Sequence, residues 1–160
     1  MTVESPAVIR VADEVWIAMA LLHREHPDAV DFSLPQIEAR LRREAIAGVV
    51  RKGVYPHLSA HCVANRPPSP GRYRMLVETA PSRRRLFRPG DAFHPDRDGA
   101  KTHPRRDDIP RKYHGLLDWY ERDYARQETE DPLLAVARHY RSLWKDTDPD
   151  AYVRSLREDW

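Results

Sequence analysis

Residues 31–65 read DFSLPQIEARLRREAIAGVVRKGVYPHLSAHCVAN, and this stretch decides the fold. Ser33 is followed three residues later by Gln36, a spacing that lets the two residues cap the start of a helix reciprocally. Phe32 and Ile37 occupy the hydrophobic positions that commonly flank such a start. One face of the helix is then formed by Ile37, Leu41 and Ala45, and a glycine, Gly48, ends it. The pattern therefore predicts a short helix from Ser33 to about Gly48.

A second helix is predicted after the basic turn Arg51–Gly53. Val54, Leu58 and Cys62 are four residues apart, so they share one face of a helix that ends near Asn65. Cys62 is therefore expected to be buried.

One helix precedes this pair and one hairpin follows it. Apolar residues at helical spacing predict a helix from Pro6 to about His26, and alternating residues predict strands at 72–79 and 85–88 around a basic turn, 80–84. Three helices followed by a hairpin is the element order of winged helix-turn-helix domains, which residues 1–90 resemble in architecture. The predicted fold class is mainly α with a small antiparallel β-hairpin, a winged helix-turn-helix plus a C-terminal helical arm.

The remainder of the chain divides into three predicted segments. Residues 91–109 are rich in Pro, His and Asp without periodicity, which predicts an irregular strap loop. Residues 110–128 predict a supporting helix. Residues 129–160 predict a helical arm of two short helices, which begin at Asp131-Pro132 and Asp148-Pro149.

Charge is distributed unevenly along the chain, whose formal net charge is +2. Residues 51–90 carry nine basic and one acidic side chain, whereas residues 1–50 carry five and eight and residues 113–160 carry seven and eleven. Such a basic block predicts an anion-binding surface for double-stranded DNA. A solvated arginine-rich face and a winged domain that binds protein are the alternatives. The expected DNA-binding residues are Arg51, Lys52, Tyr55, Ser59, Arg66, Arg72, Arg74, Arg83, Arg84 and Arg85.

Other chemistry finds little support in the sequence. A single cysteine, Cys62, excludes an intramolecular disulfide and a multi-cysteine metal site. His57 and His61 are spaced to share a zinc ion, but that spacing alone is a weak signal. The acidic residues with Lys101 in 94–101 lie in a proline-rich loop rather than on adjoining strands that could fix magnesium. We therefore expect no catalytic residue, no metal, no cofactor and no enzymatic activity.

No segment of the sequence predicts membrane insertion. Nowhere do about 18 apolar residues run together, and the polar N-terminus lacks a basic stretch followed by an apolar one. The expected location is the cytoplasm, with no membrane partner.

The most specific sequence motifs lie in the last part of the chain. Residues 131–135 read DPLLA, and residues 143–160 read LWKDTDPDAYVRSLREDW. These resemble the C-terminal region of VapB-type antitoxins, which follows a short DNA-binding domain and wraps around a VapC toxin, a PIN-domain ribonuclease. The resemblance implies that the chain is the DNA-binding antitoxin of a type II toxin–antitoxin pair and represses its own promoter.

The arm contains the residue types that such an inhibitor needs. A PIN nuclease holds magnesium with acidic side chains, so an inhibitor must bring cations to that cluster and apolar anchors to the surrounding groove. The expected toxin-binding residues are Trp144, Tyr152, Val153, Arg154, Leu156, Arg157 and Trp160. Two alternatives stay open: a stand-alone winged-helix transcription regulator whose tail packs in cis or forms a homodimer, and a protein-interaction module of a larger assembly.

Overall fold

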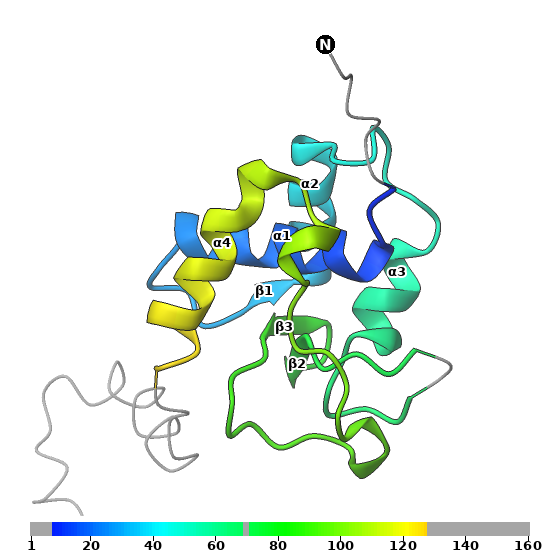
Figure 1. Ribbon diagram of the computed structural model, residues 1–160. Coiled ribbons are helices and arrows are strands. Elements are labelled where there is room, and N and C mark those ends of the chain that lie inside the picture. Colours follow the sequence, from blue (N-terminus) through cyan, green and yellow to red (C-terminus); the bar gives the residue numbers. More distant parts are fainter. Residues whose placement is uncertain (1–7, 69–70, 128–160) are drawn as a thin grey trace, which may run out of the picture. The chain divides into compact units, whose positions relative to one another are not determined.

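The computed structural model describes residues 8–68 and 71–127, which all belong to the first of two units into which the chain divides after Gln127. Its labelled elements are α1 (Val11–Glu25), β1 (Phe32–Ser33), α2 (Leu34–Glu44), α3 (Val54–Pro56), β2 (Leu76–Ala80), β3 (Arg83–Leu86) and α4 (His114–Trp119) (Figure 1). A π-helical turn, His57–His61, continues α3, and another, Tyr120–Tyr124, continues α4. Helices with a small antiparallel sheet are what the sequence predicted at this coarse level.

Helix α1 runs through the centre of the core (Figure 1). Eleven of its 15 residues are buried, and it contacts α2, α3, β3 and α4. The buried Trp16 packs edge-on against Tyr120, with ring centroids 5.6 Å apart, and so joins α1 to the C-terminal helical segment. The helix ends at Glu25, as expected before Pro27, but it begins at Val11 rather than Pro6.

Helix α2 begins as the sequence predicted. The backbone N–H of Gln36 donates to Ser33 Oγ at 3.3 Å, and that of Ser33 donates to Gln36 Oε1 at 2.8 Å. The helix ends earlier than expected, because Ala45 adopts a left-handed conformation (φ 52°) and its N–H caps Leu41 O. Gly48, the predicted stop, lies in the turn beyond (φ 81°).

The hairpin pairs as expected, but its turn is tighter. Strands β2 and β3 are antiparallel with Leu76 opposite Leu86 and Glu78 opposite Arg84. Only residues 81–82 separate the strands, so Arg83 and Arg84 lie in β3 rather than in a turn. A third strand, β1, pairs with β3 and gives the order β1-β3-β2. Sequence reasoning missed β1 because two residues carry no periodicity.

Helix three, the name used here for α3 and its π-helical continuation (residues 54–61), is shorter than expected. Its buried face is the predicted one, since Val54, Leu58 and Cys62 are at most 1% exposed. The chain then runs along the outer edge of β2 instead of continuing the helix to Asn65: the N–H of Ala64 donates to Leu76 O at 2.7 Å. This pairing satisfies a strand edge that would otherwise be open.

The strap, residues 91–109, contains short 3-10 turns at Pro95–Arg97 and Arg106–Asp108. Its Phe93 packs on a small cluster formed by Ala64, Val77 and Phe87, on the side of the hairpin away from the main core. A 3-10 turn, Arg111–Tyr113, then leads into α4. None of the helices in residues 8–68 and 71–127 combines the length and apolar character that a membrane crossing requires.

Candidate nucleic-acid interface

The ten predicted DNA-binding residues lie in different environments, and a small group is open to solvent. Tyr55 projects from helix three with 59% of its surface exposed. Lys52, in the turn before the helix, and Arg72, in the loop before β2, are exposed and have no partner among the described residues. Ser59 is partly exposed, and its hydroxyl donates to Pro56 O at 3.3 Å. These four side chains can meet a ligand without first breaking an ion pair.

The three arginines of the hairpin do not form the exposed basic tip that the sequence predicted. The Arg84 side chain is 2% exposed, and its Nε donates to Leu58 O at 3.0 Å. Arg85, 12% exposed, makes a two-point ion pair with Asp91 at 2.7 and 2.8 Å. Arg83 is 42% exposed and pairs with Asp31 at 2.6 Å. This is a correction: a two-residue turn places Arg84 and Arg85 within β3, where both side chains are largely covered.

Two further predicted contacts also serve the fold. Arg51 lies 2.6 Å from the carboxylate of Glu14, which is nearly fully buried in α1. Arg74 stacks on the Phe93 ring at 4.4 Å and donates from Nε to Ala100 O at 3.1 Å. Both arginines hold long-range contacts, one to α1 and one to the strap.

Arg66 combines exposure with a partner. Its side chain is 46% exposed, and its Nε contacts the Glu78 carboxylate on β2. The contact with Glu78 raises the pKa of Arg66.

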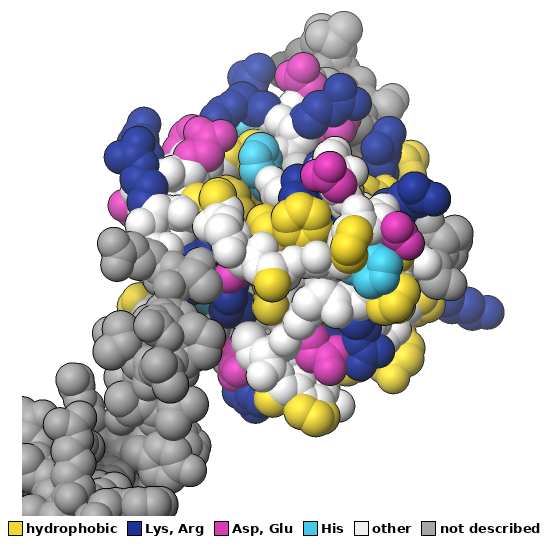
Figure 2. Space-filling view, turned by 90° about the horizontal axis from the view of Figure 1, so that it is seen from below, with side chains coloured by type: hydrophobic (Ala, Val, Ile, Leu, Met, Phe, Trp, Pro, Cys, Tyr) yellow, Lys and Arg dark blue, Asp and Glu magenta, His cyan; other side chains and the backbone are white. Residues whose placement is uncertain are grey.

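Most basic side chains of the block are therefore engaged within the fold, and five of the nine form ion pairs with carboxylates. Of its nine basic residues, seven have side-chain contacts inside the described part of the chain, and Lys52 and Arg72 have none. Figure 2 shows one face of the molecule, on which basic, acidic and hydrophobic side chains are interspersed. A count of charges along the chain overestimated the free positive surface.

Arg97, in the strap, is a central residue that sequence reasoning missed. It is fully buried, and its guanidinium donates to five backbone carbonyls. The acceptors are the carbonyls of Ala60, His61, Arg66, Pro67 and Tyr73. One cation thus fixes the end of helix three and the loops that carry Arg66 and Arg72.

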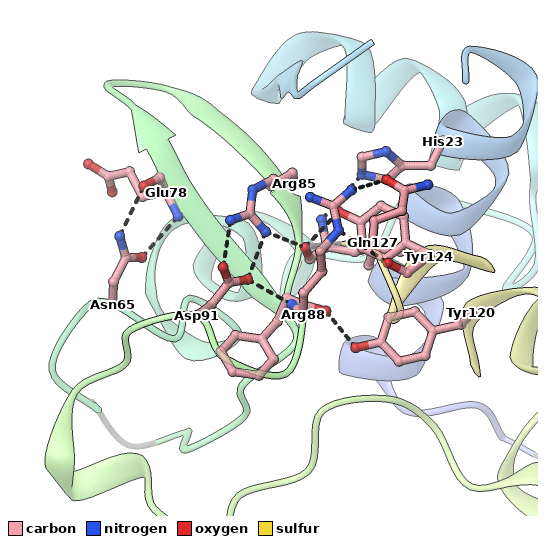
Figure 3. A network of polar contacts seen from close by, with 11 residues as sticks. His23, Asn65, Glu78, Arg85, Arg88, Asp91, Tyr120, Tyr124 and Gln127 are labelled. Atoms are coloured by element: carbon pink, nitrogen blue, oxygen red, sulfur yellow. Dashed lines mark hydrogen bonds and ion pairs between the residues drawn. The ribbon is translucent and has the colours of Figure 1, made fainter. Parts of the chain in front are cut away.

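A second missed network holds the end of β3 around Leu86, where the two-residue strand β1 no longer pairs with it (Figure 3). The N–H of Leu86 donates to His23 Nε2 at 3.2 Å, and the Tyr124 hydroxyl donates to Leu86 O at 2.7 Å. Tyr120 donates likewise to Phe87 O. Burial lowers the pKa of His23 to about 3, with the nearby arginines acting in the same direction, so the imidazole is neutral and accepts. Side chains of α1 and of the C-terminal helical segment thus replace a neighbouring strand.

The strap is also tied to α1 by a buried ion pair. Lys101 Nζ lies 2.9 Å from Asp13 Oδ1, and Asp13 is fully buried. Burial raises the pKa of Asp13, while Lys101 opposes that shift. The pair gives the second fixed point of the strap, after Arg97.

No group of three or more His, Cys, Asp and Glu residues within the described ranges could hold a metal ion. The rings of His57 and His61 lie 4.9 Å apart, edge to face, and His57 Nδ1 is 2.7 Å from Gly53 O. Cys62 is fully buried, and burial raises the pKa of its thiol. Cys62 therefore lies in the core at the end of helix three, and the two histidine rings pack against each other there.

Comparisons with known proteins returned nothing: no family model, no curated protein and no solved structure matches the chain. The predicted toxin-binding residues, from Trp144 to Trp160, lie outside the described residues. The proposals below therefore depend on the geometry of residues 8–127 and on the sequence of the arm.

Proposed function

We propose that the chain is a winged helix-turn-helix DNA-binding antitoxin that represses its own promoter and neutralises a PIN-type ribonuclease with residues 129–160. The observation that carries the DNA-binding half is the element order α1-β1-α2-α3-β2-β3 with strand order β1-β3-β2. Winged-helix domains share this arrangement, in which a short strand between the first two helices pairs with the wing. Their second motif helix enters the major groove while flanking loops grip phosphates.

The side chains available for that contact form a narrower set than the charge count suggested. Tyr55 and Ser59 lie on helix three, and Lys52, Arg66 and Arg72 flank it, all at least partly exposed. Three flanking cations suit phosphate contacts, while a tyrosine and a serine offer limited reading of bases. The proposal therefore includes modest sequence specificity from helix three.

The proposed toxin-binding function is supported by the sequence of residues 143–160, which resembles that of VapB-type antitoxins. The proposed partner is a VapC-like PIN nuclease. Arg154 and Arg157 would meet its acidic cluster, and Trp144, Tyr152 and Trp160 would anchor in the surrounding groove.

A second candidate is a protein-interaction module within a larger assembly. The internal ion pairing of five basic residues in 51–90 favours it, because a surface with few free cations has less attraction for DNA. The same pairing leaves the winged architecture intact, so the two candidates differ only in the ligand.

A salt titration separates these candidates. Fluorescence anisotropy of the full chain should be measured on a duplex from its own upstream region and on a shuffled duplex, across salt concentrations. If Lys52, Arg66 and Arg72 each neutralise one phosphate, log affinity should fall with log salt with a slope of about −2.7. Absence of binding to either duplex at low salt would favour the interaction module.

Co-expression tests the arm. The full chain should co-purify with a PIN-domain nuclease encoded beside it and suppress its ribonuclease activity, and deletion of residues 129–160 should abolish both effects. Replacing Arg154 and Arg157 by Ala should weaken inhibition, since truncating one side of a desolvated charge pair commonly costs about 2–5 kcal/mol of binding. DNA binding without any such partner would support a stand-alone regulator instead.

A further inference from the structure

Glu78 is the only acidic residue of the basic block 51–90, and two arginines share its carboxylate. Arg66 Nε contacts Glu78 Oε2 from the segment after helix three, and Arg84 Nη2 approaches the same oxygen at 3.4 Å from β3. Arg66 is 46% exposed and Glu78 22%, whereas Arg84 is 2% exposed. The carboxylate therefore has a buried cation on one side and a solvent-exposed cation on the other.

The backbone fixes these groups in register. Asn65 Nδ2 donates to Glu78 O at 2.9 Å, and the N–H of Glu78 donates to Asn65 Oδ1 at 2.9 Å (Figure 3). Because Arg66 directly follows Asn65, this clamp sets the position from which the Arg66 side chain starts. Its exposed guanidinium can still rotate about its own side-chain bonds.

The cluster also adjoins helix three. Arg84 connects it to that helix, because its Nε donates to Leu58 O at 3.0 Å, and Tyr55 on the same helix is 59% exposed. Arg66 lowers the pKa of Glu78, so the carboxylate is ionised at neutral pH and occupies the site as an anion. Guanidinium groups that hold a carboxylate oxygen also bind phosphate oxygens, and of the two that contact Glu78 only Arg66 is open to solvent.

We propose that Arg66 forms a phosphodiester-binding subsite beside helix three, that the Glu78 carboxylate occupies its guanidinium in the free protein, and that the buried Arg84 keeps Glu78 in place. On binding DNA, Arg66 moves from Glu78 to a phosphate oxygen, so Glu78 lowers affinity by holding Arg66. The proposal rests on the DNA-binding half of the proposed function. An exposed ion pair contributes little free energy, so Arg66 can exchange partners readily. The buried two-point pair of Arg85 with Asp91 offers no such exchange.

Four variants of the full chain test the exchange: Glu78→Gln, Arg66→Gln, the double variant and Asp118→Asn. Glu78→Gln should raise affinity for a random-sequence duplex about two- to fivefold, equivalent to about 0.4–1 kcal/mol at about 1.4 kcal/mol per tenfold. Arg66→Gln should reduce the salt slope by about 0.9. In the Arg66→Gln background, the gain from Glu78→Gln should disappear.

Asp118→Asn is the matched control. It releases Arg106 from an exposed ion pair of 2.7 Å between the strap and α4, and it adds the same charge as Glu78→Gln. Its effect on affinity should not depend on Arg66. If loss of the Glu78 charge beside the buried Arg84 prevents folding, Glu78→Asp provides the second variant: it keeps a negative charge but withdraws it from Arg66, and should give a smaller gain.

The outcomes separate this inference from the proposed function. A wild-type chain that binds DNA, combined with no gain from Glu78→Gln or a gain that persists without Arg66, would overturn the subsite alone. If no variant binds duplex DNA, titration with inorganic tripolyphosphate decides whether Arg66 belongs to an anion-binding site at all. Arg66-dependent tightening by Glu78→Gln would then support an anion subsite and reject DNA as its ligand, whereas no Arg66-dependent binding would overturn the subsite as well.

Discussion

The hairpin and the surroundings of helix three carry comparable positive charge in the sequence, but the fold uses it in opposite ways. In the hairpin, Arg84 and Arg85 are 2% and 12% exposed, and their guanidinium groups contact carbonyls and the Asp91 carboxylate. Around helix three, Lys52 and Arg72 are exposed without a partner in the described part of the chain. An arginine in a short, doubly covered strand thus behaves as a core residue, and the same residue type in a flanking loop remains available to a ligand.

The largest effect is expected where an internal arginine has only carbonyl partners. Arg97→Gln removes a fully buried cation that donates to five carbonyls, and a neutral amide cannot reach all of them. Urea unfolding should show a loss of about 3–5 kcal/mol. Arg105→Gln, in the same strap but 75% exposed, should change stability by less than about 0.5 kcal/mol. Equally small losses of stability in the two variants would show that Arg97 does not hold helix three in place.

The second-largest loss of stability is expected for the hairpin arginine Arg85. Arg85→Gln leaves the Asp91 carboxylate, which is 3% exposed, without its guanidinium, although the N–H of Arg88 still donates to it at 2.7 Å. The expected loss is about 2–4 kcal/mol, and Asp91→Asn in the same chain should recover part of it. Arg106→Gln breaks an exposed pair and should cost less than about 1 kcal/mol. A drop in DNA affinity at unchanged stability would instead make Arg85 a ligand contact.

Acid should destabilise β3 through His23. The folded protein holds this imidazole neutral with a pKa of about 3, whereas the unfolded chain binds the proton near its ordinary value of 6.5. Stability is therefore fully present above pH 6.5 and falls as the pH is lowered, by about 2 kcal/mol between pH 8 and pH 5. Above pH 5 the paired carboxylates of Glu25, Glu44 and Glu78 contribute little, because their ordinary pKa of 4.5 in the unfolded chain lies below this range and their folded pKa is lower still.

His23→Gln tests the assignment, since the amide oxygen can accept from Leu86 N–H but does not titrate in this range. Thermal unfolding of this variant should depend on pH less steeply than that of the wild type between 8 and 5, with a remainder from His57, whose pKa burial also lowers. An equally steep loss in the wild type and the variant would place the titrating group elsewhere.

Local features of the sequence predicted local structure well. The spacing of Ser33 and Gln36 fixes a helix start because both partners lie within one turn. The four-residue spacing of Val54, Leu58 and Cys62 identified the buried face of helix three, because one face of a helix is a local property.

Features that depend on distant partners could not be read from the sequence. Arg51 is neutralised by Glu14, 37 residues away, so its exposure does not follow from neighbouring residues. The strap has no periodicity, and Arg97 acts through carbonyls of a segment 24 to 37 residues earlier. The end of helix three was missed for a related reason, since β2 offers the backbone of residues 62–65 a better partner than another helical turn.

The central claim is that DNA is held by the exposed cations around helix three and not by the arginines of the hairpin. The most direct measurement is the slope of log affinity against log salt for the wild type, for Lys52→Gln with Arg72→Gln, and for Arg85→Gln at a temperature where all three are folded. The double variant should lose about 1.8 from the magnitude of the slope, at about 0.9 per phosphate contact, with unchanged stability, and Arg85→Gln should keep the wild-type slope. A double variant with the wild-type slope, or an Arg85→Gln chain with a reduced one, would contradict the account.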